Sequence, residues 1–417
     1  MENLAPSAQQ LCRILSFDPS AQAGLERPGA VDWPAVLALA LPQNLAPLLY
    51  QRIYALNLVS AVPATVLVAL QAQYLRSANR GMWLVRQFDT ILAGLNAARI
   101  PVIPLKGIYL AQAVYQNPAL RPMSDIDILL QSQDMAPGVD VLKALGYQPV
   151  RPFDLRSEFK FHRHLPAFIQ PGWPALEVHN ALQEPSDPFS IDLGGLWSRA
   201  SETSIGSRAI TALEPHDLLL YLCINVAFHD LFHVGLKGLY DLGAVIAHFQ
   251  ATLDWDELYR RCQSWRAARL VYITLSLAHR LLDAAVPAEF LARLAPPQLD
   301  EAVFSICTDF IFANPASEAP PVTPDLERLV RAASPLAKLG ILLNRLFISR
   351  AEMAWYYNLP PYSWKLLLCY PRRLKYLAGR YFSIGLRLGR GDPGLALVSD
   401  EIRLQKNQRE RLVSNLV

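Results

Sequence analysis

Two aspartates, Asp125 and Asp127, are separated by a single residue in the run Ser124 to Leu130, and carboxylates at this spacing can bind a metal ion together. Side chains alternate between the two faces of a β-strand, so both carboxylates project to one side while Ile126 and Ile128 project to the other. Like charges this close repel each other, so the pair needs a counter-cation, and hard oxygen ligands favour Mg²⁺ or Mn²⁺. A polar strand end or a turn is the alternative interpretation of these two residues alone.

A third carboxylate follows in Ala175 to His179, which is predicted to be another short strand. Glu177 and His179 share one face of that strand, and Leu176 and Val178 share the opposite, apolar face. If the two strands are neighbours, Glu177 joins the aspartates and completes a two-metal site. His179 is expected to be a hydrogen-bonded polar neighbour of this site.

Lys106 and Gly107 lie where a short apolar run, Val102 to Leu105, meets a predicted helix, Ile108 to Gln116. The free backbone N–H groups and the positive dipole end of a helix start can hold phosphate oxygens. Lys106 would add a charge-assisted contact. A plain strand-to-helix turn with a solvated lysine is the alternative interpretation.

These residues belong to a predicted mixed α/β unit that helices precede and follow. Helices broken by prolines are expected from Trp33 to Ala98, and helices return after Glu214. The expected strands are Val102–Leu105, Ser124–Leu130, Phe159–His164, Ala167–Gln170 and Ala175–His179, and the later helices are Val139–Leu145, Leu218–Phe228, Gly238–Phe249 and Asp256–Leu282. The sequence therefore predicts an α+β fold with a helical lead-in (1–99), a small mixed-sheet core (100–210), a helical domain (211–313) and a basic helical segment (325–417).

The motifs LKG, RPMSDIDILL, LEVHN, EPHDLLLYLC and LKGLYDL occur in this order between Leu105 and Leu242, within a resemblance to a known family that covers about residues 30–310. In this respect the chain resembles the uncharacterised nucleotidyltransferase family, a branch of the DNA polymerase beta superfamily. The resemblance implies that Gly107 faces a triphosphate, that Asp125 and Asp127 bind two divalent metal ions, and that Glu177 completes the metal site. It also implies transfer of an NMP from an NTP to a hydroxyl of a protein, an RNA or a small molecule, with Mg²⁺ or Mn²⁺ as cofactor and pyrophosphate as the leaving group.

The chain departs from the superfamily pattern at the glycine motif. Lys106-Gly107 replaces the usual Gly-Ser or Gly-Gly, and the segment from Gly107 to Asp125 is longer than usual. The resemblance therefore implies an enlarged loop in which Arg121 and Ser124 take over part of the triphosphate contact. The second hypothesis is a non-catalytic module of the same fold that binds a nucleotide without turning it over.

Lys237 and Asp241 are four residues apart on a predicted helix, where they could form an ordinary ion pair. The resembled family implies a different role, because this helix would close over the nucleotide and Lys237 would contact a phosphate.

His229 and His233, in the run His-Asp-Leu-Phe-His, would share one face of a helix as in the H-E-x-x-H zinc hydrolases. Asp230 is one methylene shorter than the glutamate of that motif, and the sequence offers no third ligand. A capping or packing role is therefore expected, and a zinc hydrolase is the third hypothesis. His162 and His164, on one face of the expected strand Phe159–His164, are expected to be polar neighbours of the site.

Composition excludes several classes of protein. The 417 residues are 52% hydrophobic and 18% charged, so the chain can bury a substantial core and disorder is not its dominant state. The mean hydropathy is +0.17, yet no run of 18 apolar residues occurs and no secretory signal is recognised. Five widely spaced cysteines favour neither a disulfide framework nor a zinc site, and a cytoplasmic location is expected.

The basic residues are concentrated near the C-terminus. Residues 331–417 contain 15 Lys and Arg against 5 Asp and Glu, although the net charge of the whole chain is only +3. Aromatic residues alternate with the basic ones between Tyr362 and Arg390. Such a pattern is typical of binding to RNA or to an anionic membrane surface, and a solvated helix that covers the acidic part of the same protein is the alternative.

Overall fold

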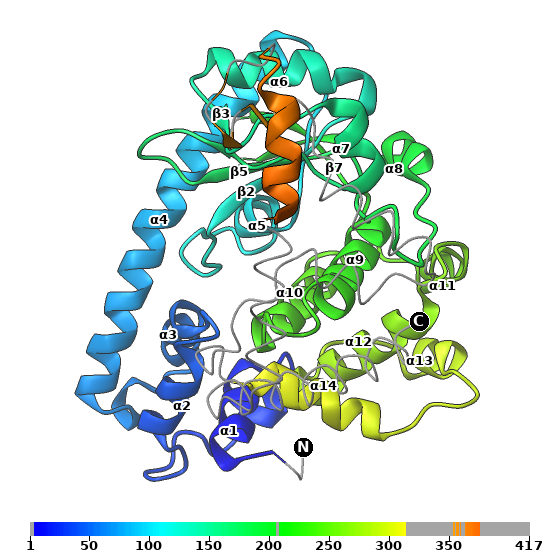
Figure 1. Ribbon diagram of the computed structural model, residues 1–417. Helices are drawn as coiled ribbons and strands as arrows, with labels where there is room; N and C mark the ends of the chain where they lie inside the picture. The colour runs from blue at the N-terminus through cyan, green and yellow to red at the C-terminus, as the bar shows by residue number, and fades with distance from the viewer. Residues whose placement is uncertain are drawn as a thin grey trace, which may run out of the picture.

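The computed structural model describes residues 4–205 and 208–313, and near the C-terminus residues 353–354, 356–357, 359 and 363–375. Helices, one small mixed sheet and a separate two-stranded hairpin make up the described fold, so the α+β prediction is confirmed. Figure 1 shows the sheet near the top of the molecule, with the helices α9 (Pro215–Ile224), α10 (Leu236–His248) and α12 (Ala268–Leu282) below it and the long helix α4 (Ala64–Ala97) along one side.

Prolines mark the boundaries of the N-terminal helices, as the sequence predicts. The helices are α1 (Pro6–Leu15), α2 (Trp33–Ala40), α3 (Ala46–Ala55) and α4 (Ala64–Ala97). Pro34 and Pro47 occupy the first turns of α2 and α3, where the missing N–H needs no partner, and Pro63 precedes α4. Helix α1 was not predicted.

Five strands form the sheet in the order β1-β2-β5-β4-β3. Their bounds are β1 (Ile103–Pro104), β2 (Asp125–Leu129), β3 (Gln148–Pro149), β4 (Phe168–Ile169) and β5 (Ala175–His179). Strands β2 and β5 run parallel, and the other neighbours are antiparallel. The central parallel pair lets two chain segments about fifty residues apart present their side chains in register.

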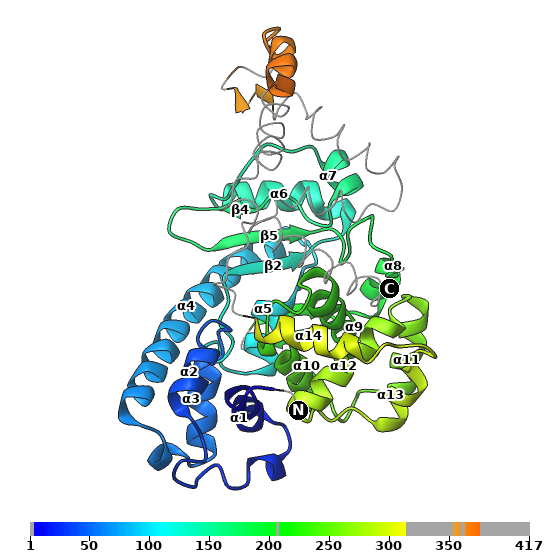
Figure 2. The same cartoon turned by 60° about the horizontal axis from the view of Figure 1, so that its bottom comes forward.

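The two faces of the sheet meet different partners. Figure 2 shows α6 (Met135–Ala144) and α7 (Leu155–Phe161) above the sheet, and α5 (Lys106–Tyr109), α9 and α10 below it. Ile126 and Ile128 are fully buried in the core, as expected for the apolar face of β2. A π-helical turn, Leu110–Val114, continues α5.

The predicted strand Phe159–His164 is wrong, because its first half, residues 159–161, belongs to helix α7. Asp154 caps that helix by accepting a hydrogen bond from the Ser157 N–H, and Arg151 pairs with Glu158. Only His164 keeps extended pairing, through an isolated bridge to His179. His162 and His164 therefore do not share a strand face.

A hairpin and seven more helices follow the sheet in the described chain. They are α8 (Leu193–Arg199), the hairpin β6 (Ser201–Ile205) and β7 (Arg208–Ala212), and then α9 (Pro215–Ile224), α10 (Leu236–His248), α11 (Trp255–Ser264), α12 (Ala268–Leu282), α13 (Ala288–Leu294) and α14 (Ala302–Phe312). The hairpin was not predicted. The single helix expected over Asp256–Leu282 is wrong, because Arg266 adopts a left-handed conformation (φ +55°) and separates α11 from α12.

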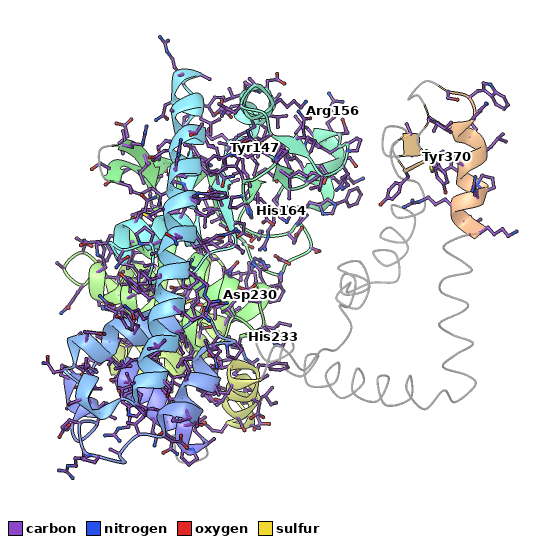
Figure 3. All side chains as sticks on the ribbon, turned by 90° about the vertical axis from the view of Figure 1, so that its left-hand side faces the viewer. Tyr147, Arg156, His164, Asp230, His233 and Tyr370 are labelled. Atoms are coloured by element: carbon purple, nitrogen blue, oxygen red, sulfur yellow. The ribbon has the colours of Figure 1, made fainter. Side chains whose placement is uncertain are left out.

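One continuous hydrophobic core joins α1 to α14 across the three predicted segments 1–99, 100–210 and 211–313. Phe17, after α1, stacks on Tyr240 of α10, and its backbone N–H bonds to Leu282. The helical residues 366–375 form a separate small cluster with Met353 and Ala354, and Figure 3 shows Tyr370 far from the main body. All five cysteines are buried as free thiols, and none of the described helices is long and apolar enough to cross a membrane.

We predict that Gly81→Ala destabilises the protein, although alanine usually favours a helix. A Cβ at position 81 would lie 2.8 Å from Cβ and 2.9 Å from the carbonyl oxygen of Pro118, so α4 would be pushed off the loop that carries Arg121 and Ser124. The free energy of unfolding should fall by about 1–3 kcal/mol in chemical denaturation. Asn79→Ala, at an exposed position of the same helix, is the control. Equal stability of Gly81→Ala and the wild type would contradict this packing.

Candidate active site

A cavity of about 360 Å³ lies between the sheet and the helical part of the molecule. Strand β2, the loop before it and the start of α5 form one wall, and α9, α10 and the segment between them form the other. Its lining residues are Asn44, Lys106, Gly107, Arg121, Pro122, Met123, Ser124, Asp125, Asp127, Leu222, Asn225, Val226, Asp230, Val234, Lys237, Gly238 and Asp241. The volume is in the range of small-molecule sites in proteins.

Two carboxylates and an imidazole meet where β2 pairs with β5. Asp127 and Glu177 are direct partners in the parallel register, and His179 follows on the same face of β5. His179 Nε2 lies 3.0 Å from Asp127 Oδ1 and 3.6 Å from Glu177 Oε2. One ligand atom of each residue lies within 4.8 Å of the others, which is close enough to surround one metal ion.

The hydrogen bond between His179 and Asp127 has a definite direction. An ionised carboxylate only accepts, so His179 Nε2 carries the proton and donates it to Asp127. Burial would raise the pKa of Asp127, but the charge of Lys106 and the bond from His179 outweigh it and hold this pKa well below its usual range. The same imidazole is the main cause of the lowered pKa of Glu177. Both carboxylates are therefore ionised at neutral pH.

Asp125 lines the same cavity but is not part of that cluster among the described residues. Its Oδ1 accepts a hydrogen bond of 3.0 Å from the Ser124 hydroxyl. Burial first, and the nearby Asp127 second, raise the pKa of Asp125 above its ordinary value. The mutual repulsion expected from the D-x-D spacing is thus present, and a cation between the two carboxylates would relieve it.

Lys106 supplies a cation close to the carboxylates. Its Nζ lies 3.5 Å from Asp127 Oδ1. Its backbone has φ +28°, a strained conformation for a residue with a side chain, of the kind that is found at functional sites. A Cβ on Gly107 would meet Arg121 Nη1 at 3.3 Å and Met123 Sδ at 3.4 Å, so glycine lets the start of α5 approach this loop closely.

Arg121 is occupied by a buried ion pair that joins the two walls. Its guanidinium donates to both Asp241 carboxylate oxygens, at 2.9 and 3.0 Å for the shorter contacts, and the Tyr115 hydroxyl donates to Asp241 at 2.6 Å. Arg121 and Asp241 are 7% and 4% exposed. Arg121 therefore shapes the loop beside the cavity, and its guanidinium is engaged by protein.

Lys237 does not form the i to i+4 ion pair with Asp241 that its spacing allows, because Asp241 is taken by Arg121. No described residue provides Lys237 with an ion-pair partner within 4 Å. Burial and the charge of Arg121 lower the pKa of Lys237 to about 8. This ammonium group lines the cavity and is available to a ligand.

The zinc interpretation of the histidine pair is wrong. The helix ends in a π-helical turn, Asn225–His229, and Leu231 and Phe232 have positive φ values of 47° and 61°. His229 and His233 are therefore not on one helical face: His229 bonds to Asp187, whereas His233 packs against the ring of Phe310.

Sequence reasoning missed two polar residues that line the cavity, Asn225 and Asp230, and a nearby one, Arg163, whose carbonyl oxygen accepts from the backbone just after β5. Asn225 donates to Asp230 at 2.6 Å, and both line the cavity. Burial raises the pKa of Asp230. The sequence does single out Asn225, because it is the one amide side chain in the apolar run LLLYLCINVAF and a buried amide needs polar partners. Arg163 had no such signal, since its environment depends on contacts far away in the sequence.

The comparison with protein families agrees with this geometry. A family model described as uncharacterised nucleotidyltransferase matches residues 29–283, which is more than half of the chain. Searches of the curated proteins and of the solved structures found no match. The matched range contains the whole cavity lining, from Asn44 to Asp241. The chain therefore belongs to the uncharacterised nucleotidyltransferase family, whose name assigns it a general nucleotidyl transfer function.

Proposed function

We propose that this protein transfers an NMP from an NTP to a hydroxyl acceptor, with pyrophosphate as the leaving group and a divalent metal ion as cofactor. The observation that carries this proposal is the in-register pair Asp127 and Glu177 beside the cationic turn Lys106–Gly107. Such a site combines ligands for metal ions with donors for phosphates.

The residues present fit a divalent cation. Asp127 and Glu177 are ionised and close together, and Asp125 adds a carboxylate whose pKa is raised by burial first and by the charge of Asp127 second. Oxygen donors of this kind select Mg²⁺ or Mn²⁺, and we propose Asp125, Asp127 and Glu177 as the ligands. When bound, the metal ions neutralise phosphate charge and lower the pKa of the attacking hydroxyl. The Nε2–H group of His179 would orient the carboxylates of Asp127 and Glu177.

The transfer step has a simple balance of bonds. The acceptor oxygen attacks the α-phosphorus, the bond from that phosphorus to the β-phosphate bridging oxygen breaks, and its electron pair leaves with the pyrophosphate. Glu177, whose side chain is 29% exposed, is the proposed acceptor of the hydroxyl proton. Fixing the two reactants in line and stabilising charge would supply most of the rate enhancement.

Three groups are proposed to hold the triphosphate. The backbone N–H groups at Gly107 and the ammonium groups of Lys106 and Lys237 face one cavity. Lys106 would move from Asp127 to the phosphates once a metal ion takes its place. Arg121 and Ser124 would position this loop, Arg121 through Asp241 and Ser124 through its bond to Asp125.

The macromolecular partner is a separate question. RNA or an anionic membrane surface was predicted for the basic segment between Tyr362 and Arg390, and most of that segment lies outside the described residues. In the part that is described, Trp364, Leu367 and Leu368 are exposed. We propose this segment as the contact for such a partner.

Asp127→Asn should reduce nucleotidyl transfer by at least about a thousandfold, because an amide cannot replace the anionic metal ligand. The substitution preserves shape and an acceptor for His179, so the thermal unfolding midpoint should change little. The measurement is transfer of label from each of four α-labelled NTPs, with Mg²⁺ or Mn²⁺, into a cell lysate.

Asp140→Asn, at an exposed position of α6, is the matched control and should retain activity. Full activity of Asp127→Asn would contradict the proposed site. Nucleotide binding by the wild type without any transfer would instead support the non-catalytic module.

Lys237 should give the reaction a pH dependence. The charged form binds phosphate, and the pKa of about 8 means that this charge is lost as the pH rises above 8. The value of kcat/KM for the NTP should therefore fall by up to about tenfold per pH unit above pH 8. Lys237→Arg, which stays charged, should remove that fall, and Lys237→Met should be low throughout. The same alkaline fall in the wild type and in Lys237→Arg would exclude this role.

A further inference from the structure

His229 lies between a carboxylate and a guanidinium beside the active site. Its Nε2 lies 3.0 Å from Asp187 Oδ2, and its Nδ1 contacts Arg163 Nη1. The side chains of His229 and Asp187 are only 6% and 4% exposed. The three groups thus form one hydrogen-bonded chain, Asp187 to His229 to Arg163, which neither the family nor the proposed function assigns.

The direction of every hydrogen bond in this chain is fixed by chemistry. A guanidinium only donates, so His229 Nδ1 must accept from Arg163. His229 Nε2 then carries the proton and donates it to the carboxylate of Asp187. Burial is the main reason that the pKa of His229 falls to about 4, so the imidazole is neutral and serves as a fixed acceptor for Arg163.

The backbone of Arg163 is fixed next to the metal-binding cluster. Its carbonyl oxygen accepts from the N–H groups of Asn180 and Ala181, which directly follow β5, and its own N–H donates to Glu184. The next residue, His164, bridges to His179, and the two rings lie 5.2 Å apart. Figure 3 shows His164, Asp230 and His233 in succession from the sheet toward the helices.

Arg163 is not among the residues that line the cavity, but its positive charge reaches three residues that do. It affects the titration of Asp127, Lys106 and Asp230, so it lies within electrostatic reach of all three. Within the described ranges, no carboxylate lies within 4 Å of this guanidinium. Its buried Nε has no hydrogen-bond partner there either. A buried donor without a partner is costly, so a ligand that accepts a hydrogen bond from this group would be stabilised there.

We propose that Arg163 binds the phosphate oxygens of the triphosphate and of the departing pyrophosphate, and that His229 and Asp187 position it. This inference rests on the proposed function and names an additional contact of the same site. A guanidinium suits this task, because its planar set of N–H donors matches phosphate oxygens and keeps its charge at every working pH. Arg163 would then join Lys106 and Lys237, which line the cavity, as a third cation from a third segment of the chain.

The first test is equilibrium binding of inorganic pyrophosphate, with Mg²⁺ present, measured by calorimetry. Arg163→Gln should weaken this binding by about tenfold to a hundredfold, as expected for loss of a charge-assisted contact. Arg163→Lys keeps the charge but not the planar fork, so its binding should be intermediate. Pyrophosphate binding needs no turnover, so this readout is independent of catalysis.

Two substitutions of His229 test the positioning role. His229→Leu removes the acceptor and should weaken pyrophosphate binding almost as much as Arg163→Gln. His229→Gln retains an acceptor for Arg163 and a donor for Asp187, and should restore most of the affinity. The control is His233→Gln, in the same loop but on the ring of Phe310, which should bind like the wild type.

Unchanged pyrophosphate binding in Arg163→Gln would overturn this inference and leave the proposed function intact. Equal loss in His229→Gln and His229→Leu would overturn the positioning role. A wild-type protein that binds neither ATP nor pyrophosphate would contradict the proposed function together with this inference. Thermal unfolding of each variant shows whether a loss of binding reflects a loss of the fold.

Discussion

The site depends on one buried anion, the carboxylate of Asp127. It is 3% exposed, and an ionised carboxylate at that depth is stable only with close partners. His179 donates to it from β5, and Lys106 faces it from the start of α5. The parallel pairing of β2 with β5 and the strained backbone of Lys106 both serve this arrangement. A metal ion bound at Asp127 would replace Lys106 and release its ammonium group toward phosphates.

A second buried charge pair holds the two walls of the cavity together. Arg121 comes from the loop before β2, and Asp241 comes from α10. Breaking such a pair by removing one partner typically costs about 3–5 kcal/mol, because the other charge remains buried. This pair fixes the position of α10 relative to the sheet, and hence of Lys237, which stands one helical turn before Asp241. The family resemblance gave Arg121 a direct phosphate role, whereas the geometry engages it with protein.

The sequence predicted the strands and helices whose positions depend on local sequence patterns. Alternation located β2 and β5, and prolines located α2, α3, α4 and α9, because strand faces and helix starts depend on neighbours in sequence. The strand expected at Phe159–His164 failed because the cap at Asp154 and the pair of Arg151 with Glu158 favour a helix there. Arg163 was missed for a related reason: its partners His229 and Asp187 are distant in the chain. The side-chain alternation of β5 placed Glu177 and His179 on one face, but their contact with Asp127 needed the register of two strands.

The central claim is that the cluster around Asp127 binds a divalent metal ion together with a nucleotide. Mn²⁺ binding measured by electron paramagnetic resonance, with and without ATP, tests it most directly. We expect the wild-type protein to bind Mn²⁺, ATP to tighten this binding, and Asp127→Asn to lose it. Mn²⁺ binding that is absent from the wild type, or equal in Asp127→Asn, would contradict the account.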